Sequence, residues 1–300
     1  MNLAALGDCL TMSSCVVTQI SAGLIIGMLL FLVACGLTLI FGVLGVINFT
    51  HGSFYMLGAY FALTVFQATD SYLAAVIAGS LGVALFGLVF ERYFMSRVYG
   101  GDVLMQLLVC YAFILILDDV VKIVWGSDFR SMGMPPAFLL PPLRVFGGFV
   151  PPFYLFLTGV SVATAIVLAL LIDRTRFGKI VRAAAVNRQM VGALGINTSL
   201  VYAAVFALGS LLAGAAGALA APVRSVVPGM GFSILIECFI VTVIGGMGSI
   251  AGAFVAAVLV GLTRSFGSIG FPLFTDGLMF VLMALVLLVK PTGIFGRRPG

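Results

Sequence analysis

Residues 9–69 read CLTMSSCVVTQISAGLIIGMLLFLVACGLTLIFGVLGVINFTHGSFYMLGAYFALTVFQAT, a stretch of 61 residues without Asp, Glu, Lys or Arg. A helix needs about 20 apolar residues to cross a bilayer, so this stretch is long enough for two or three crossings. Across all 300 residues, 62% are hydrophobic and 8% are charged, against about 25% charged in soluble domains. A soluble fold would leave much of this apolar surface in water. The composition therefore excludes soluble enzymes and nucleic-acid-binding domains.

The gaps between charged residues predict an all-α fold, in which residues 1–300 form a single transmembrane helix bundle of about nine spans (eight to ten). The apolar segments are too long and unbroken for the ~10-residue alternation of a membrane β-barrel. A helix also satisfies the backbone hydrogen bonds that lipid cannot. The expected spans are residues 17–44, 53–69, 72–90, 103–118, 153–172, 199–220, 231–245, 249–263 and 275–290.

The positions of Lys and Arg predict the orientation. With the N-terminus outside, ten basic residues face the cytoplasm, in 91–102, in 173–198 and at the C-terminus, and five lie outside. Because Lys and Arg concentrate in cytoplasmic loops, this bias favours an outside N-terminus and an inside C-terminus. Residues 118–152 then form an outer loop, and its six prolines predict an extended, semi-rigid segment. The N-terminus lacks the basic region of a cleavable signal peptide, so we expect the first span to be retained.

Residues that commonly carry catalysis or bind metals are sparse. The five cysteines (9, 15, 35, 110 and 238) have no CxxC spacing, and we expect small apolar packing rather than disulfide or metal chemistry. There is no HExxH motif, no pair of acidic residues within a span and no cluster of His or Cys. The sequence therefore predicts no membrane enzyme, no metal site and no cofactor.

Two apolar segments interrupted by glycine lie towards opposite ends of the chain. Such interruptions are the best sequence pointer to a transport pathway, although both segments also fit ordinary turns between neighbouring spans. Elsewhere, small residues four apart, as at Gly23 and Gly27, predict close helix packing. The candidate pathway residues are Asn48, His51 and Ser53 in the first segment, and Gly245, Gly246, Gly248 and Ser249 in the second.

Two ionisable residues lie in or beside apolar spans. His51 is the only histidine and has no acidic residue near it in sequence. We expect it to be a hydrogen-bonded structural residue rather than a proton relay. Glu237 lies within FSILIECFIVTV, and an ionisable group at membrane depth is a functional candidate, here for the pathway. It could instead pair with Arg224 or Arg264.

The cytoplasmic loop 173–197 carries five basic residues. Its small and apolar residues recur at helical spacing, which predicts a short amphipathic helix on the membrane surface, ending near Gly192 and Gly195. Topogenic charge explains the arginines equally well. The small residues together with Asn187 and the run Gly195–Asn197 favour a knob that docks into a cytoplasmic protein.

Four motifs extend over nearly the whole chain: GLTLIFGVLGVINFTHGSFYMLGAY (36–60), RAAAVNRQMVGALGIN (182–197), VIGGMGSIAGAF (243–254) and KPTGIFG (290–296). In these motifs the chain resembles the membrane permease subunits of ABC importers for branched-chain amino acids and related polar solutes such as urea and amides. This resemblance implies a multi-pass permease of the bacterial inner membrane that forms the translocation pathway. It also implies a second permease subunit, identical or different, two ATP-binding subunits and an extracytoplasmic solute-binding protein as partners.

The resemblance further implies that the loop 173–197 contains the helix that couples the permease to an ATPase. Arg182 precedes the alanines here, so the loop follows the Glu-Ala-Ala pattern of other importers only loosely. The candidate contact residues are Arg182, Ala184, Ala185, Asn187, Gly192, Gly195, Ile196 and Asn197.

The sequence has no GxxxxGK[ST] motif, since its only Gly-Lys pair, Gly178-Lys179, is followed by Ile180. If transport is driven by ATP, hydrolysis therefore takes place on a partner, and this chain converts the partner's movement into alternating access. The alternative function is an ion-coupled secondary transporter or channel that acts without an ATPase, through Glu237 or His51. In the importer, we expect the binding protein to carry most of the solute selectivity.

Overall fold

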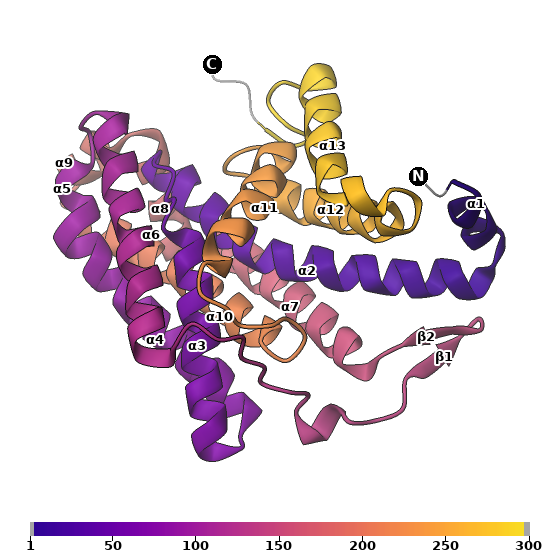
Figure 1. Cartoon of the computed structure of the whole chain (residues 1–300). Coiled ribbons are helices and arrows are strands. Elements are labelled where there is room, and N and C mark those ends of the chain that lie inside the picture. Colours follow the sequence, from indigo (N-terminus) through magenta and orange to yellow (C-terminus); the bar gives the residue numbers. More distant parts are fainter. Residues whose placement is uncertain (1–2, 297–300) are drawn as a thin grey trace.

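The computed structural model describes residues 3–296, which form a bundle of helices with one short β-hairpin (Figure 1). Apart from this hairpin, the predicted all-α fold is correct. Arg297 and Arg298, which contribute to the predicted cytoplasmic charge, lie outside the described residues. The α-helices are α1 (Leu3–Thr11), α2 (Ser13–Leu44), α3 (His51–Thr69), α4 (Tyr72–Phe90), α5 (Ser96–Val98), α6 (Val103–Trp125), α7 (Pro152–Arg174), α8 (Arg176–Val186), α9 (Arg188–Ala193), α10 (Thr198–Ala220), α11 (Met230–Gly245), α12 (Ile250–Gly270) and α13 (Thr275–Val289).

Each predicted span coincides with a helix. Within the described residues, six helical segments are long and apolar enough to cross a membrane, and α11 is a shorter apolar helix. The chain is thus a mostly helical, polytopic membrane protein. Nine crossings and an outside N-terminus remain predictions. The six segments are Ser13–Leu44, Tyr72–Val98, Pro152–Arg174, Thr198–Ala220, Ile250–Gly270 and Pro272–Val289.

Helix α2 is the central element of the bundle, with α12 on one side and α7 on the other (Figure 1). Its 32 residues are apolar on every face, and all of residues 27–40 are buried. A helix that is hydrophobic all round lies either in a protein core or against lipid, and neighbouring helices cover residues 27–40 here. Glycine permits that closeness: a Cβ on Gly27 would lie 2.6 Å from the carbonyl oxygen of Ala257 in α12. The predicted small-residue packing is confirmed at this contact.

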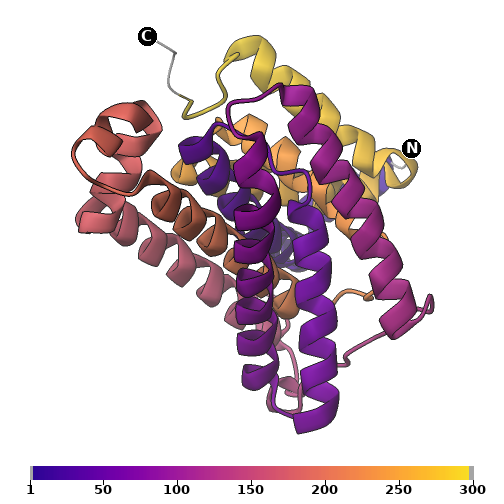
Figure 2. The same cartoon turned by 90° about the vertical axis from the view of Figure 1, so that its left-hand side faces the viewer.

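A second group of helices, α3, α4 and α6, runs side by side in both views (Figures 1 and 2), and α10 packs against α3 and α4. Three glycines from three helices meet here. A Cβ on Gly79 of α4 would lie 2.7 Å from the Gly58 carbonyl oxygen of α3. A Cβ on Gly214 of α10 would lie 2.8 Å from the Gly79 carbonyl oxygen. These backbones touch, so no larger residue fits between them.

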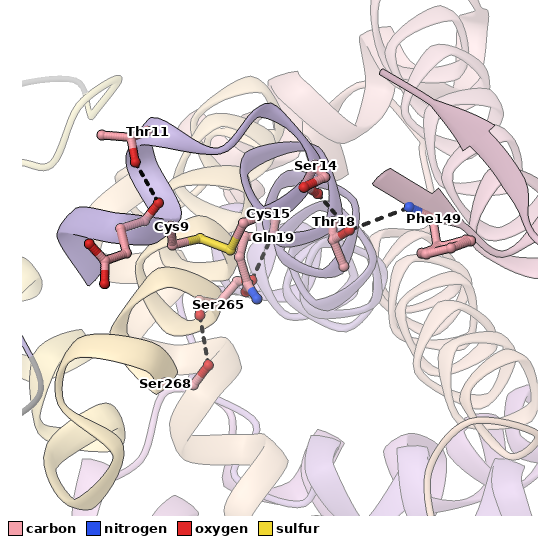
Figure 3. Close-up of a disulfide and its surroundings, with 10 residues drawn as sticks. Cys9, Thr11, Ser14, Cys15, Thr18, Gln19, Phe149, Ser265 and Ser268 are labelled. Carbon is pink, nitrogen blue, oxygen red and sulfur yellow. Dashed lines mark hydrogen bonds between the residues drawn. A yellow bond between two sulfur atoms is a disulfide. The ribbon is translucent and has the colours of Figure 1, made fainter. Parts of the chain in front are cut away.

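A disulfide joins Cys9 of α1 to Cys15 of α2 (Figure 3), so the expectation that the cysteines form no disulfide is wrong for this pair. Six residues of straight helix would separate the two Cα atoms by about 9 Å. The helix is interrupted at Met12, and this bend brings the Cα atoms to 5.2 Å. The other cysteines, at 35, 110 and 238, are free and buried, as expected for apolar packing.

The predicted outer loop begins later than expected, because α6 continues through residues 118–125. After it, β1 (Leu143–Val145) and β2 (Gly148–Val150) form an antiparallel hairpin, where an extended segment without strands is predicted. The hairpin lies on the first turns of α2: Phe149 N donates to Thr18 Oγ1 at 3.4 Å (Figure 3).

Candidate functional site

The first glycine-interrupted segment is the break between α2 and α3. Gly45, with φ of 67°, ends α2 in the left-handed conformation that glycine adopts without strain. Asn48, His51 and Ser53 follow, and all three are buried inside the bundle. The Thr50 backbone N–H donates to Asn48 Oδ1 at 3.0 Å, so the Asn48 side chain holds the turn into α3.

His51 is anchored to the middle of α2. Its Nε2 lies 3.0 Å from the Val33 carbonyl oxygen, and because a carbonyl only accepts, Nε2 carries the proton. His51 is thus hydrogen-bonded, as predicted, and it is fully buried.

Three buried polar atoms at this break have no hydrogen-bond partner among the described residues: Asn48 Nδ2, His51 Nδ1 and Ser53 Oγ. Unpaired polar groups are costly in an apolar environment, at about 1–3 kcal/mol each in proteins. Close packing of the helices does not by itself account for three unpaired polar groups at one helix break. The assignment of these residues to the pathway remains a prediction.

The second segment is the turn between α11 and α12. Gly246 and Gly248 have φ of 96° and 88°, and Ser249 Oγ caps α12 by accepting from the Gly252 N–H at 3.1 Å. The C-terminal motif KPTGIFG (290–296) packs on this turn. Ile294 N donates to the Ile244 carbonyl at 2.8 Å, and Phe295 N donates to the Gly245 carbonyl at 3.0 Å. The motif satisfies carbonyls at the end of α11 that have no partner within the helix.

The glycines of this turn are required by close approach of the backbone. A Cβ on Gly245 would lie 2.6 Å from Ala253 N, and Gly248 faces Gly42 of α2. The geometry gives Gly245, Gly246, Gly248 and Ser249 clear structural roles. Their place on a pathway remains a prediction.

Glu237 lies within an ion network that joins three helices and a loop. Glu237 is 8% exposed, and its Oε1 lies 2.7 Å from Arg264 Nη1 of α12. Its Oε2 lies 3.8 Å from Arg224 Nη2, in the segment between α10 and α11. Arg264 also approaches Asp276 of α13 at 3.4 Å. Of the two interpretations of Glu237, the structure displays the pairing, with both arginines at once.

The loop 173–197 contains two short helices, α8 and α9, so the prediction of a single helix is wrong at residue 187. Asn187 interrupts the helix and caps α9, with its Oδ1 accepting from Met190 N at 2.9 Å. Asn197 caps α10 in the same way, accepting from Ser199 N at 3.1 Å. Short polar side chains compete with helical backbone bonds and favour such caps.

The remaining candidate residues of this loop differ in their surroundings. Arg182 pairs with Asp173 at 3.0 Å and donates to the Ile172 carbonyl, which ties α8 to the end of α7. Ala184 is buried and Ile196 is half-buried. By contrast, three residues face solvent: Ala185, Gly192 and Gly195.

Sequence reasoning missed a row of exposed apolar side chains on the same loop. Val186, Met190 and Leu194 are 89%, 64% and 75% exposed. Met190 and Leu194 are four residues apart, in α9 and at its C-terminal end, so they share one face, whereas Val186 is the last residue of α8, before the break at Asn187. The recurrence of an apolar residue at every fourth position was the available signal. The loop thus presents an apolar row beside its basic residues.

Comparison with known proteins decides the family. The family described as "Branched-chain amino acid transport system / permease component" matches residues 19–289. The chain belongs to this family. BraD, the high-affinity branched-chain amino acid transport system permease protein of Pseudomonas aeruginosa, is 35% identical, and the match covers 93% of this chain and 95% of BraD. LivH, the protein of the same description from Escherichia coli, is 30% identical over the same shares.

Among solved structures, PsaBC from Streptococcus pneumoniae in complex with Fab aligns over 96% of this chain and 95% of that chain, with a TM-score of 0.47 and 13% identity.

The chain is therefore the permease component of a branched-chain amino acid ABC transport system. The ATPase of such a system is a separate subunit, in agreement with the lack of a GxxxxGK[ST] motif in the permease. The alternative of an ion-coupled transporter without an ATPase is thereby set aside.

Proposed function

We propose that the permease spans the inner membrane nine times with its N-terminus outside. It pairs there with a second permease subunit, and α8 and α9 receive the movement of an ATP-binding subunit. Branched-chain amino acids, delivered by an extracytoplasmic binding protein, are its solutes.

The Cys9–Cys15 disulfide supports the orientation. Disulfides persist in oxidising compartments such as the bacterial periplasm and are rare in the cytosol. The disulfide lies at the start of α2, next to the β-hairpin and to the last turns of α12, where Ser265 donates to Gln19 (Figure 3). These elements then lie on the outer side, and α8 and α9, after the other end of α7, lie on the inner side.

The apolar row formed by Val186, Met190 and Leu194 carries the docking proposal. Exposed apolar side chains in a row, surrounded by charged residues, mark a protein interaction surface. The loop is also tied to the spans on both sides of it, by the Arg182–Asp173 ion pair at one end and by the Asn197 cap at the other. A knob tied in this way can transmit a displacement to the spans on either side of it.

A charged residue in the row tests this role. In liposomes that contain all subunits, Met190→Asp should reduce ATP-driven leucine uptake at least about tenfold, since loss of a hot-spot contact at the centre of an interface costs about 2 kcal/mol or more. ATP hydrolysis by the ATP-binding subunits should continue, no longer stimulated by the loaded binding protein. The matched control Met190→Leu keeps the row apolar and should transport normally. Normal uptake by Met190→Asp would contradict the docking role.

A further inference from the structure

One pocket of the permease opens beside the segment that joins α10 to α11. Its volume is about 260 Å³, close to the lower end of the ~300–1,000 Å³ that small-molecule sites occupy. The pocket is therefore of the size for a small solute. It is lined by Tyr55 of α3, by Arg224 and Ser225 of the joining segment, and by Met230, Ser233 and Ile234 of α11.

Arg224 is the only charged residue among the six that line this pocket. Its nearest carboxylate oxygen, Glu237 Oε2, lies at 3.8 Å, which is beyond hydrogen-bond distance. Glu237 lies closer to Arg264, at 2.7 Å, so two guanidinium groups share one buried carboxylate. Arg264 has a second partner in Asp276, at 3.4 Å. Arg224 therefore retains donors for a further anion, and its side chain is 30% exposed beside the pocket.

The other lining residues divide into polar and apolar ones. The hydroxyl groups of Tyr55 and Ser225 offer neutral hydrogen bonds, whereas the Ser233 hydroxyl already donates to the Met230 carbonyl at 2.9 Å. Met230 and Ile234, one turn apart on α11, offer apolar surface. A carboxylate beside an arginine, with an aliphatic group against apolar side chains, is the arrangement that an aliphatic amino acid requires.

We propose that this pocket binds the α-carboxylate of an aliphatic amino acid through Arg224, with the side chain of the amino acid against Met230 and Ile234. The proposal rests on the proposed function, because the solute class and the outer position of the pocket come from it. The pocket is then the first contact of the permease with a solute released by the binding protein.

Protection of an introduced thiol tests this site directly. The native free cysteines are buried, so a water-soluble maleimide should react with Ser233→Cys at the pocket wall. In membranes that contain the complete transporter, L-leucine at about ten times its Kd should slow this labelling about tenfold, because only the empty site reacts. L-leucinamide has the same side chain without the carboxylate and should give little protection. Equal protection by both compounds, or by neither, would overturn the proposal.

The arginine is tested in the same background. Arg224→Gln removes the charge and keeps a donor, and it should weaken protection by leucine about ten- to a hundredfold, the value of a charged hydrogen bond. The control Arg144→Gln removes an exposed charge from the hairpin and should leave protection unchanged. An unchanged rate of labelling in the absence of ligand shows that Arg224→Gln is folded. If Arg224→Gln does not fold, Ile234→Trp replaces it in the test, because this variant fills the pocket, leaves the charges intact and should abolish protection. Retained protection in Arg224→Gln, or in Ile234→Trp, would overturn the proposal.

Leucine uptake by the same complete transporter separates the two proposals. Uptake without protection means that the pocket assignment is wrong while the proposed function stands. Absence of ATP-driven uptake of any aliphatic amino acid contradicts the proposed function itself.

Discussion

The contact between α3 and α10 at Gly58 leaves no room for an added methyl group. A Cβ on Gly58 would lie 2.5 Å from Gly214 Cα and 2.8 Å from the Gly214 carbonyl carbon. Nonbonded carbons prefer about 3.5–4.0 Å, so the two helices would have to separate by roughly 1 Å. Overpacking costs about 1–3 kcal/mol, and the upper end applies here because backbone atoms cannot rotate away. After about 1 kcal/mol is subtracted for the higher helix propensity of alanine, Gly58→Ala should lose about 2 kcal/mol of stability.

Gly159→Ala in α7 is the matched control, because no atom lies within 4 Å of the Cβ it would add. It should be neutral or stabilising by up to about 1 kcal/mol. The buried thiols of Cys35, Cys110 and Cys238 report unfolding, since a maleimide dye reacts with them only when the bundle opens. On heating in detergent, Gly58→Ala should unfold about 4–8 °C below the unmodified permease. A Gly58→Ala variant with the same melting temperature as Gly159→Ala would refute the argument from close helix contact.

Two further changes probe the ion network and the disulfide. Glu237→Gln leaves Arg224 and Arg264 without their shared carboxylate and should lose about 2–3 kcal/mol of stability in the same thermal assay. This loss is somewhat less than the ~3–5 kcal/mol that a fully buried ion pair loses when one partner is removed. The control Asp276→Asn, at an exposed position, should lose less than about 1 kcal/mol. An unchanged melting temperature in Glu237→Gln would show that the carboxylate is not needed. Cys15→Ser removes the disulfide that closes a short loop and should cost about 2 kcal/mol of local stability in α1. Hydrogen exchange of the backbone amides of residues 3–12 should therefore accelerate roughly 30-fold. Exchange at the original rate would mean that packing alone holds α1 in place.

The sequence predicted the helices well because their physical cause is local. Runs of about 20 apolar residues in lipid have few alternatives to helix, so all nine expected spans coincide with helices. The observed helix ends differ from the predicted ends at positions where a capping side chain or a bend determines them. Helix α6 continues past Asp118 to Trp125, and Asn187 divides the cytoplasmic helix in two.

The features that the sequence did not reveal depend on distant contacts. The Cys9–Cys15 disulfide requires the bend at Met12, which no strong turn residue announces. The pairing of Glu237 was one of two open interpretations, and only the packing of α11 against α12 brings Arg264 within reach. The pocket at Arg224 needs Tyr55 of α3 to lie beside residues 224–234, which are far from it in sequence. Residue spacing alone does not establish the disulfide, the pairing of Glu237 or the pocket.

The pathway candidates illustrate the same division. Glycines at the α11–α12 turn are explained by positive φ and by contact with the C-terminal motif, which a pattern of glycines could not distinguish from a transport passage. At the α2–α3 break, the buried polar residues were visible in the sequence. Their unpaired atoms became visible only in the fold.

The central claim is that the segment 173–197 faces the cytoplasm and contacts a separate ATP-binding subunit. Leu194→Cys, at a side chain that is 75% exposed, tests it with a membrane-impermeant maleimide, and Phe146→Cys in the hairpin, 81% exposed, serves as the control for the opposite face. In intact cells, only Phe146→Cys should be labelled. In inverted vesicles, Leu194→Cys should be labelled and should cross-link to the ATP-binding subunit. Labelling of Leu194→Cys in intact cells would contradict the account.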